Sequence, residues 1–455
     1  MKQLVRFLSQ HWLSSILVAG FILLASFAVR NALVSPEDPR LAAIRQAGYP
    51  VTPTELNAFY PAVPENQNAA LVYGRAFESA LFTNKIAEVL ISNVVSKRGE
   101  RLPEAYRAQL AEALDQNAAA WQLLYSATNF PSSRYPIDLR NGFALLLPHL
   151  SKVKQAATFL SIEGLSRASA GESNQAFAAF DAALHVADSL RQEPLLISYL
   201  VRVAADKIVA QRLEETLNLV GFSEEELHSL ESGFATATDQ RWPARALAAE
   251  RAVGLSVFLD RQVQRSLIGP NQLMSGMPVG FPGRLFLGAY RTSGLLARDE
   301  TFYLEEMGKC VTFAELPPEE RIRKGPLPST KPIPRSLILS RQLLPALSQV
   351  IVRAVDYTAR MRVVEAALGV ERFRWAHSGA LPTQLADLVP DVVEAVPIDP
   401  YDAQPLRYKK LPLGYVVYSI GPDLHDDGGA APPSDQSQSR STPTPADITF
   451  TVERN

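Results

Sequence analysis

The stretch at 154–190 reads KQAATFLSIEGLSRASAGESNQAFAAFDAALHVADSL and carries the sharpest helical pattern of the chain. Its second half repeats apolar residues every three or four positions, as on one face of a helix. These residues are Ala176, Phe180, Ala183, Ala187 and Leu190. Between the two halves, Gly171 suits a left-handed C-terminal cap and Ser173 suits an N-cap. The sequence therefore predicts two helices joined at 170–173.

Similar periodicity on both sides predicts an α-helical body at 35–315. A long amphipathic helix is expected after Pro194, and Ser223 is expected to cap another helix whose first turn is acidic. The pair at 154–190 resembles a single tetratricopeptide repeat. The residues at that family's packing positions are Leu165, Gly171, Ala176, Phe180, Ala183 and Leu184. No second copy follows at the family's period of about 34 residues, so an ordinary helical hairpin is favoured over a repeat-like body.

Composition excludes several classes of protein. The 455 residues are about three average domains long, and 47% of them are hydrophobic, so the chain can bury a large core. With 45 basic and 47 acidic side chains the net charge is -2, which leaves no basic field for nucleic acid. The lone Cys310 excludes an intrachain disulfide and multi-cysteine zinc or iron–sulfur sites.

An uncharged apolar run occupies residues 12–29, with Lys2 and Arg6 before it and Arg30 after it. Extended to Val34 as a helix, this segment approaches the ~30 Å hydrocarbon core of a bilayer. We therefore predict an N-terminal membrane anchor at 1–34. The predicted protein is single-pass in the inner membrane of a bacterium, with the bulk of the chain extracytoplasmic.

Two other interpretations of this segment remain. It could be a cleaved signal peptide, because Ser26 and Ala28 have the spacing of a cleavage site. The mature protein would then be periplasmic or secreted. It could also be a buried core helix, although the basic flanks favour membrane insertion.

The C-terminal part differs in character from the body. Six prolines within 316–335 predict a Pro-rich linker at 316–336. After it, 337–455 is predicted as a small α+β module. A long helix from 341 ends near Trp375, strands at 406–410 and 415–420 form a hairpin, and alternating apolar residues at 448–452 form a third strand. The predicted fold class is mainly α, with this one antiparallel element.

A succession of short motifs runs through that module. They are GALP at 379–382, VPIDP at 396–400, LRY at 406–408, YVVYSIGPD at 415–423, DDGG at 426–429 and DI at 447–448. In order and spacing they resemble the C-terminal domain of the major pseudopilin of type II secretion systems, over roughly 100 residues. The family's processing site before an apolar helix has no counterpart here. An ordinary filament subunit is therefore excluded, and a pilin-like head on an anchored helical body is expected.

The resemblance implies a calcium site in the acidic loop, with Asp423, Asp426, Asp427 and Asp447 at the matching positions and Ser419 beside them. Calcium takes six to eight oxygen ligands, which flexible loops rich in Asp and Gly can supply. The low-complexity segment 430–446 separates Asp447 from the other three and is longer than the family's connection. The alternative is that these aspartates only cap turns.

No motif names a reaction. The histidines are scattered, and the sequence contains no His-Glu-x-x-His pair, Gly-x-Ser-x-Gly elbow, Walker loop or dinucleotide fingerprint. The histidines are His11, His149, His185, His228, His377 and His425. We therefore expect no enzyme and no small-molecule substrate.

The expected function is that of an anchored cell-envelope scaffold with protein partners and a calcium-stabilised head, beside secretion or pilus machinery. One alternative is a cleaved periplasmic or secreted binding protein unrelated to secretion. Another is an enzyme with a site assembled from dispersed residues.

Overall fold

The computed structural model describes residues 38–79, 98–236, 241–266, 281–324, 332–344, 348–430 and 447–454. The chain divides into two compact units, Met1–Tyr49 and Pro50–Asn455. In the first unit the described residues form α2 (Pro39–Gln46), which Asp38 caps by accepting a hydrogen bond from Arg40 N. The anchor predicted at 1–34 lies outside the described residues. No described helix combines the length and apolar character that a bilayer crossing requires.

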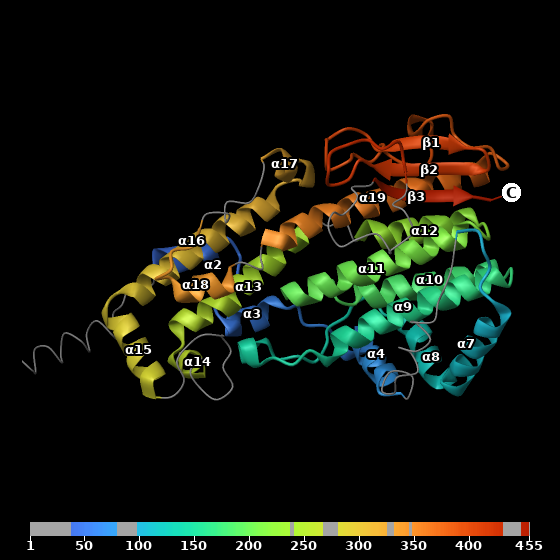
Figure 1. Ribbon diagram of the computed structural model, residues 1–455. Helices are drawn as coiled ribbons and strands as arrows, with labels where there is room; N and C mark the ends of the chain where they lie inside the picture. Colours follow the sequence, from blue (N-terminus) through green and yellow to red (C-terminus); the bar gives the residue numbers. More distant parts are fainter. Residues whose placement is uncertain are drawn as a thin grey trace, which may run out of the picture. The chain divides into compact units, whose positions relative to one another are not determined.

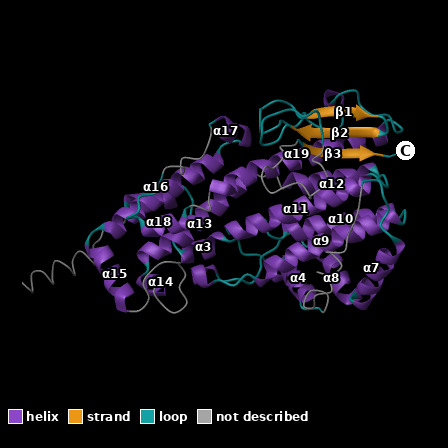
Figure 2. Ribbon diagram, viewed as in Figure 1, coloured by secondary structure: helices purple, strands orange, loops and turns teal. Residues whose placement is uncertain are grey.

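The second unit is mainly helical with one small antiparallel sheet, which confirms the predicted class (Figure 1 and Figure 2). Its N-terminal half contains α3 (Pro53–Phe59), η1 (Glu65–Gln67), α4 (Ala69–Phe77), α7 (Glu104–Gln116), α8 (Ala118–Ser126), η2 (Ala127–Asn129), η3 (Leu139–Ala144), α9 (Pro148–Ser169), α10 (Ser173–Asp188) and α11 (Leu196–Leu217). Its C-terminal half contains α12 (Glu224–Ala235), α13 (Arg241–Leu259), α14 (Arg261–Ser266), α15 (Phe281–Thr292), α16 (Leu295–Glu315), α17 (Pro318–Arg323), α18 (Ile338–Leu343), α19 (Ser348–Ala376), η6 (Leu385–Leu388), β1 (Arg407–Leu411), β2 (Gly414–Ser419) and β3 (Ile448–Glu453).

The helical hairpin predicted at 154–190 is confirmed as α9 and α10. Gly171 has φ +84°, and its N–H donates to Ala168 O while the next N–H donates to Arg167 O, which is a Schellman cap. The N-cap predicted at Ser173 is wrong, because Ser173 is the first helical residue and its neighbour Glu172 occupies the cap without a side-chain bond. At Ser223 the predicted cap is confirmed as a full capping box with Glu226.

Small residues let α9 and α10 approach closely. A Cβ on Gly164 of α9 would lie 2.6 Å from the Phe180 ring of α10, so only glycine fits there. Helix α9 also packs against α11. Residues on successive positions of α9, such as Phe159 and Leu160, are completely buried. Helix α9 therefore forms the centre of the helical layer.

The sheet is a meander with strand order β1–β2–β3. In the register of β2 and β3, Tyr415 lies opposite Val452 and Ser419 lies opposite Ile448. A Cβ on Gly414 would meet the backbone of Val452, so β2 must begin with glycine. This arrangement confirms the predicted hairpin and third strand.

One face of the sheet rests on α19, and the other side of α19 contacts α12 (Figure 1). Ala366, Ala367 and Leu368 are consecutive and fully buried, although successive helical residues point about 100° apart. The helix end near Trp375 is confirmed, but the predicted start at 341 is wrong. Residues 338–343 form the separate helix α18, and Pro345 in the sequence between them cannot donate a helical hydrogen bond.

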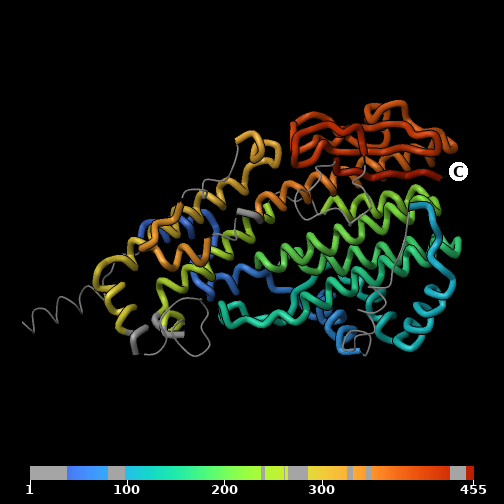
Figure 3. The backbone as a smooth tube through the Cα atoms, in the orientation of Figure 1, coloured from blue at the N-terminus to red at the C-terminus, as the bar shows by residue number. Residues whose placement is uncertain are grey.

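Side chains of α11 pair with the outer edge of β3. Glu214 Oε1 accepts from Thr451 N at 2.9 Å, while Asn218 Nδ2 donates to Thr451 O at 2.9 Å and Asn218 Oδ1 accepts from Glu453 N at 2.7 Å. Arg454 then donates to the carbonyl of Leu217 at the end of α11. In Figure 3 the last strand accordingly returns beside a segment more than 230 positions earlier. These side chains bond to the outward-facing backbone groups of β3 that a further strand would otherwise pair with.

The predicted linker at 316–336 contains α17, whose Arg321 is buried and donates to the carbonyls of Leu316 and Ala314. Residues 325–331 of this segment lie outside the described ranges. The structure groups the residues on both sides of it into one compact unit. The division into a body at 35–315 and a module at 337–455 stays a prediction.

Replacing Asn218 should loosen the sheet from the helical body. Asn218→Ala leaves Thr451 O and Glu453 N buried without their partners, which should lower the free energy of unfolding by about 2 kcal/mol. Urea unfolding followed by circular dichroism measures this. Gln211→Ala, at an exposed position of the same helix, is the matched control and should have little effect. Equal losses in the two variants would contradict a specific role for the Asn218 bonds.

Candidate functional site

The acidic loop follows β2 directly, and β3 brings the distant Asp447 back to it. Asp447 precedes Ile448, which pairs with Ser419 at the end of β2. Strand pairing therefore places Asp447 beside the loop, whatever the length of the segment 430–446. Most of that segment, 431–446, lies outside the described residues.

Asp447 binds backbone N–H groups of the loop. It is 3% exposed, and its carboxylate accepts from Gly429 N at 2.7 Å and from Asp427 N at 3.4 Å. Burial raises the pKa of Asp447, the two N–H bonds lower it, and the charges of Asp426 and Asp427 raise it further. Asp447 thus organises the loop, and its buried charge is unfavourable beside two other carboxylates.

The remaining predicted ligands form local turns. Asp423 accepts from His425 N at 3.2 Å, and Asp426 accepts from Gly428 N at 2.9 Å. Asp427 Oδ1 lies 3.1 Å from His425 Nδ1. The structure brings Asp426, Asp427 and Asp447 together, whereas Asp423 binds the backbone of His425.

This arrangement does not present a ready calcium cage. Both oxygens of Asp447 accept N–H bonds, and Asp426 Oδ2 faces Arg407 Nε at 3.8 Å. Within the described ranges, no three histidine, cysteine, aspartate or glutamate side chains converge as a metal site requires. Carboxylates would have to turn from these partners to coordinate an ion, so the calcium site stays a prediction.

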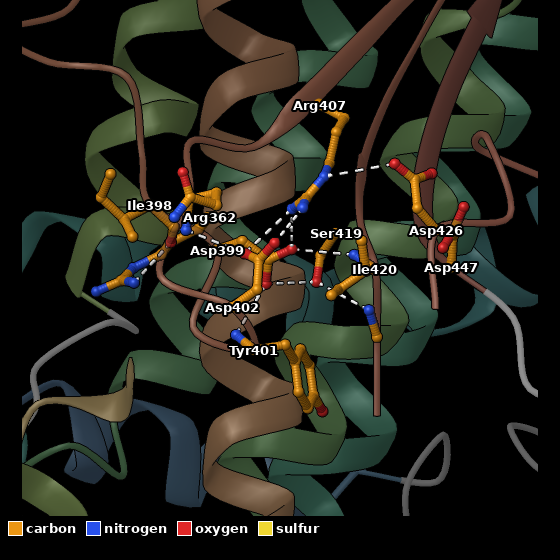
Figure 4. Close-up of polar contacts among 12 residues, drawn as sticks. Arg362, Ile398, Asp399, Tyr401, Asp402, Arg407, Ser419, Ile420, Asp426 and Asp447 are labelled. Atoms are coloured by element: carbon orange, nitrogen blue, oxygen red, sulfur yellow. Dashed lines mark hydrogen bonds and ion pairs between the residues drawn. The ribbon is translucent and has the colours of Figure 1, made fainter. Parts of the chain in front are cut away.

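A second carboxylate, Asp399, is the polar centre of the module (Figure 4). Asp399 is fully buried and accepts from Ser419 Oγ at 2.9 Å, Ile420 N at 3.0 Å and Tyr401 N at 3.0 Å. Arg407 Nη1 donates to it at 2.7 Å and also contacts Asp402. The Ser419 hydroxyl therefore binds Asp399 instead of the aspartates of the acidic loop.

Sequence reasoning missed the role of Asp399. It appeared only as one letter of the VPIDP motif, and its partners come from β1, β2 and the turn at 401. The only local signal is a lone acidic residue between Ile398 and Pro400 in an otherwise apolar stretch, which favours burial with a partner. The tertiary fold decides which partner that is.

Sequence reasoning also missed a buried pair in the helical body. His149 Nε2 lies 3.0 Å from Glu193 Oε2, and its ring stacks on Tyr135 at 4.2 Å between centroids. Ser198 donates to the same glutamate, which is fully buried. His149 borders a mostly apolar groove of about 770 Å³, but Glu193 does not line it. The pair holds the N-terminal end of α9 to the turn before α11.

Comparison of the chain with known protein families, with curated proteins and with solved structures finds no match. The resemblances to pseudopilins and to a tetratricopeptide repeat stay predictions.

Asp399 should contribute more to stability than Asp402, the partly exposed second carboxylate that pairs with Arg407. Asp399→Asn removes the buried charge that faces Arg407 and should cost about 3 kcal/mol of unfolding free energy. Asp402→Asn removes a partly exposed ion pair with Arg407 and should cost less than about 1 kcal/mol. Chemical denaturation of both variants measures the difference. If both variants lost a similar unfolding free energy, pairing with Arg407 would explain the loss, and the buried network around Asp399 would not.

Calcium should raise the thermal midpoint of the full chain relative to a chelator if the acidic loop binds it, because a ligand of the native state stabilises that state. The double variant Asp426→Asn with Asp427→Asn should lose the shift, and Asp391→Asn in another exposed loop should keep it. The experiment requires the full chain, because α12 covers a side of α19 that would be exposed in the isolated module. Equal midpoints with calcium and chelator would leave the aspartates as turn caps.

Proposed function

We propose that this chain is a membrane-anchored scaffold of the cell envelope, which holds a pseudopilin-like head on a helical body for interaction with other envelope proteins. Type II secretion or pilus machinery is the proposed setting. The apolar segment at 12–29 supplies the anchor in this proposal. The proposed head comprises α19 and the sheet.

The observation that carries the proposal is the attachment of the head to the body. A filament subunit needs a helix that is free to pack against other subunits. Here α19 is buried between the sheet and α12, and Arg372 of α19 donates to Glu224 and Glu231, which lie two turns apart on α12. The outer edge of β3 is occupied by α11. This supports a head that works in place on its own chain.

The proposal also needs a surface for partners. Strand β1 is the opposite edge of the sheet and pairs only with β2 among the described strands. Lys409 and Lys410 on it are exposed, and Leu413 in the following turn is 55% exposed. Lysines on an edge strand discourage self-association, so this edge suits an unlike partner better than a second copy.

The full chain should remain with bacterial membranes after an alkaline wash, and its mature N-terminus should include the segment 12–29. A photo-reactive amino acid at Leu413 should then form crosslinks with an envelope protein, because this side chain is exposed on the proposed head. Mass spectrometry identifies both the N-terminus and the crosslinked partner. A partner from secretion or pilus machinery would support the proposed setting.

The same photo-reactive group at Leu285, an exposed position of α15 in the helical body, is the control and should not reach that partner. A mature N-terminus near Val29 would contradict the anchor and support the cleaved periplasmic or secreted form. Absence of any crosslink at Leu413 in membranes would contradict the head as the interaction module.

A further inference from the structure

An apolar groove of about 770 Å³ lies between α4, the segment 135–148 and the first turns of α9, and the proposed function does not use it. Ligand pockets in proteins are commonly about 300–1,000 Å³, so the groove has room for a small molecule. Ile137 and Leu145 pack against the buried core, so this wall is already formed in the folded chain. The large apolar side chains of the lining are Leu71, Phe77, Ile137, Leu145 and Leu146.

Two of these side chains are left in contact with water. Leu146 is 82% exposed and Leu71 is 37% exposed, and both border the same groove. Covering apolar surface with an apolar molecule is favourable because it removes that surface from water. The lining therefore suits a ligand whose body is apolar.

His149 adds a hydrogen-bond acceptor to this apolar lining. Its Nε2 lies 3.0 Å and 3.2 Å from the two carboxylate oxygens of Glu193, which places the ring proton on Nε2 and leaves Nδ1 as the acceptor. Nδ1 has no hydrogen bond with any described residue, whereas Nδ1 of His185 and of His377 each contacts a carbonyl four residues earlier. The His149 side chain is 9% exposed and borders the groove, so a ligand there can reach the ring.

The charges around the groove balance one another. Those of the lining are two basic and two acidic side chains, Arg75, Lys152, Glu78 and Asp138. Behind the lining, Arg140 pairs with Asp138 and Glu193 faces His149, which adds one charge of each sign. A charged ligand would therefore meet no excess of the opposite charge, and electrostatics favour a neutral one.

Gly74 keeps the α4 wall of the groove open. It lies inside α4, where glycine costs about 0.5–1 kcal/mol relative to alanine. A Cβ at this position would meet no described atom within 4 Å, so packing within the described chain does not require glycine. Gly288 and Gly308 are equally open, but they do not border the groove. A side chain at Gly74 would enter the space in which a ligand would lie.

We infer that this groove binds a neutral, largely apolar molecule with a hydroxyl group, an alcohol or a phenol, whose hydroxyl donates to His149 Nδ1. The apolar body covers Leu71 and Leu146, and the donor meets the acceptor that Glu193 orients. A peptide would bring many backbone donors and acceptors into a lining that is mostly apolar. A small molecule with one polar group matches the groove better.

Calorimetric titration of the purified full chain with para-butylphenol and with octanol tests this inference. At least one of them should bind, and its methyl ether should bind about 3- to 10-fold more weakly, because the ether has lost the donor of one uncharged hydrogen bond. The nitrogen resonance of His149 Nδ1, followed by NMR in isotope-labelled protein, should shift with the alcohol and not with the ether. An unchanged resonance with the alcohol bound would contradict His149 as the acceptor.

Gly74→Leu should weaken binding at least about 10-fold, because the new side chain occupies the groove. This variant should not lower the thermal midpoint, since leucine is a better helix former than glycine and has open space there. Gly308→Leu, at another half-buried and open position inside a helix, is the matched control and should leave the affinity unchanged. The inference is overturned if neither alcohol binds at millimolar concentration, or if Gly74→Leu binds as well as the unaltered protein does.

Discussion

The hydrogen bonds between α11 and the outer edge of β3 are the constraint on which the C-terminal half depends. A three-stranded sheet leaves two edges unpaired, and the backbone groups of a buried edge must find other partners. Glu214 on α11 and Asn218 at the C-cap of this helix are four residues apart, so both side chains reach the same strand. They bond to Thr451 and Glu453 as a neighbouring strand would. Strand β3 is thereby joined to α11 of the helical body.

This attachment determines the environment of α19. The sheet covers one side of the helix while α12 covers another, so α19 has apolar residues around most of its circumference. Polar contacts connect its N-terminal part to α11 as well, since Tyr357 donates to Asp206 and Lys207 pairs with Asp356. A helix held in this way belongs to the core of its own chain. This is the physical basis for proposing a fixed head and not a polymerising one.

The buried contacts place several ionisable groups in a poorly solvated environment. Burial raises the pKa of Glu214 to about 7, although its bond from Thr451 N and the charge of Arg98 lower it. Desolvation likewise raises the pKa of Asp206, which faces Arg202. Such groups contribute little net stability, because desolvation offsets much of their attraction. Their bonds instead specify which surfaces meet, while burial of apolar side chains supplies the main stabilising free energy.

The sequence by itself determined the elements whose signals are local. Apolar periodicity, Gly171 and Ser223 predict where helices run and end, because side-chain direction follows backbone geometry. The turn at 411–414 predicts the hairpin, and alternation at 448–452 predicts the third strand. Cap details at Ser173 and the break before α19 were missed, since neighbouring residues compete for the same backbone groups. Only the tertiary structure decided the partners of Asp399, the pairing of His149 with Glu193 and the anchoring of β3 by α11. Each unites residues tens to hundreds of positions apart, and no local pattern records which buried polar groups will meet.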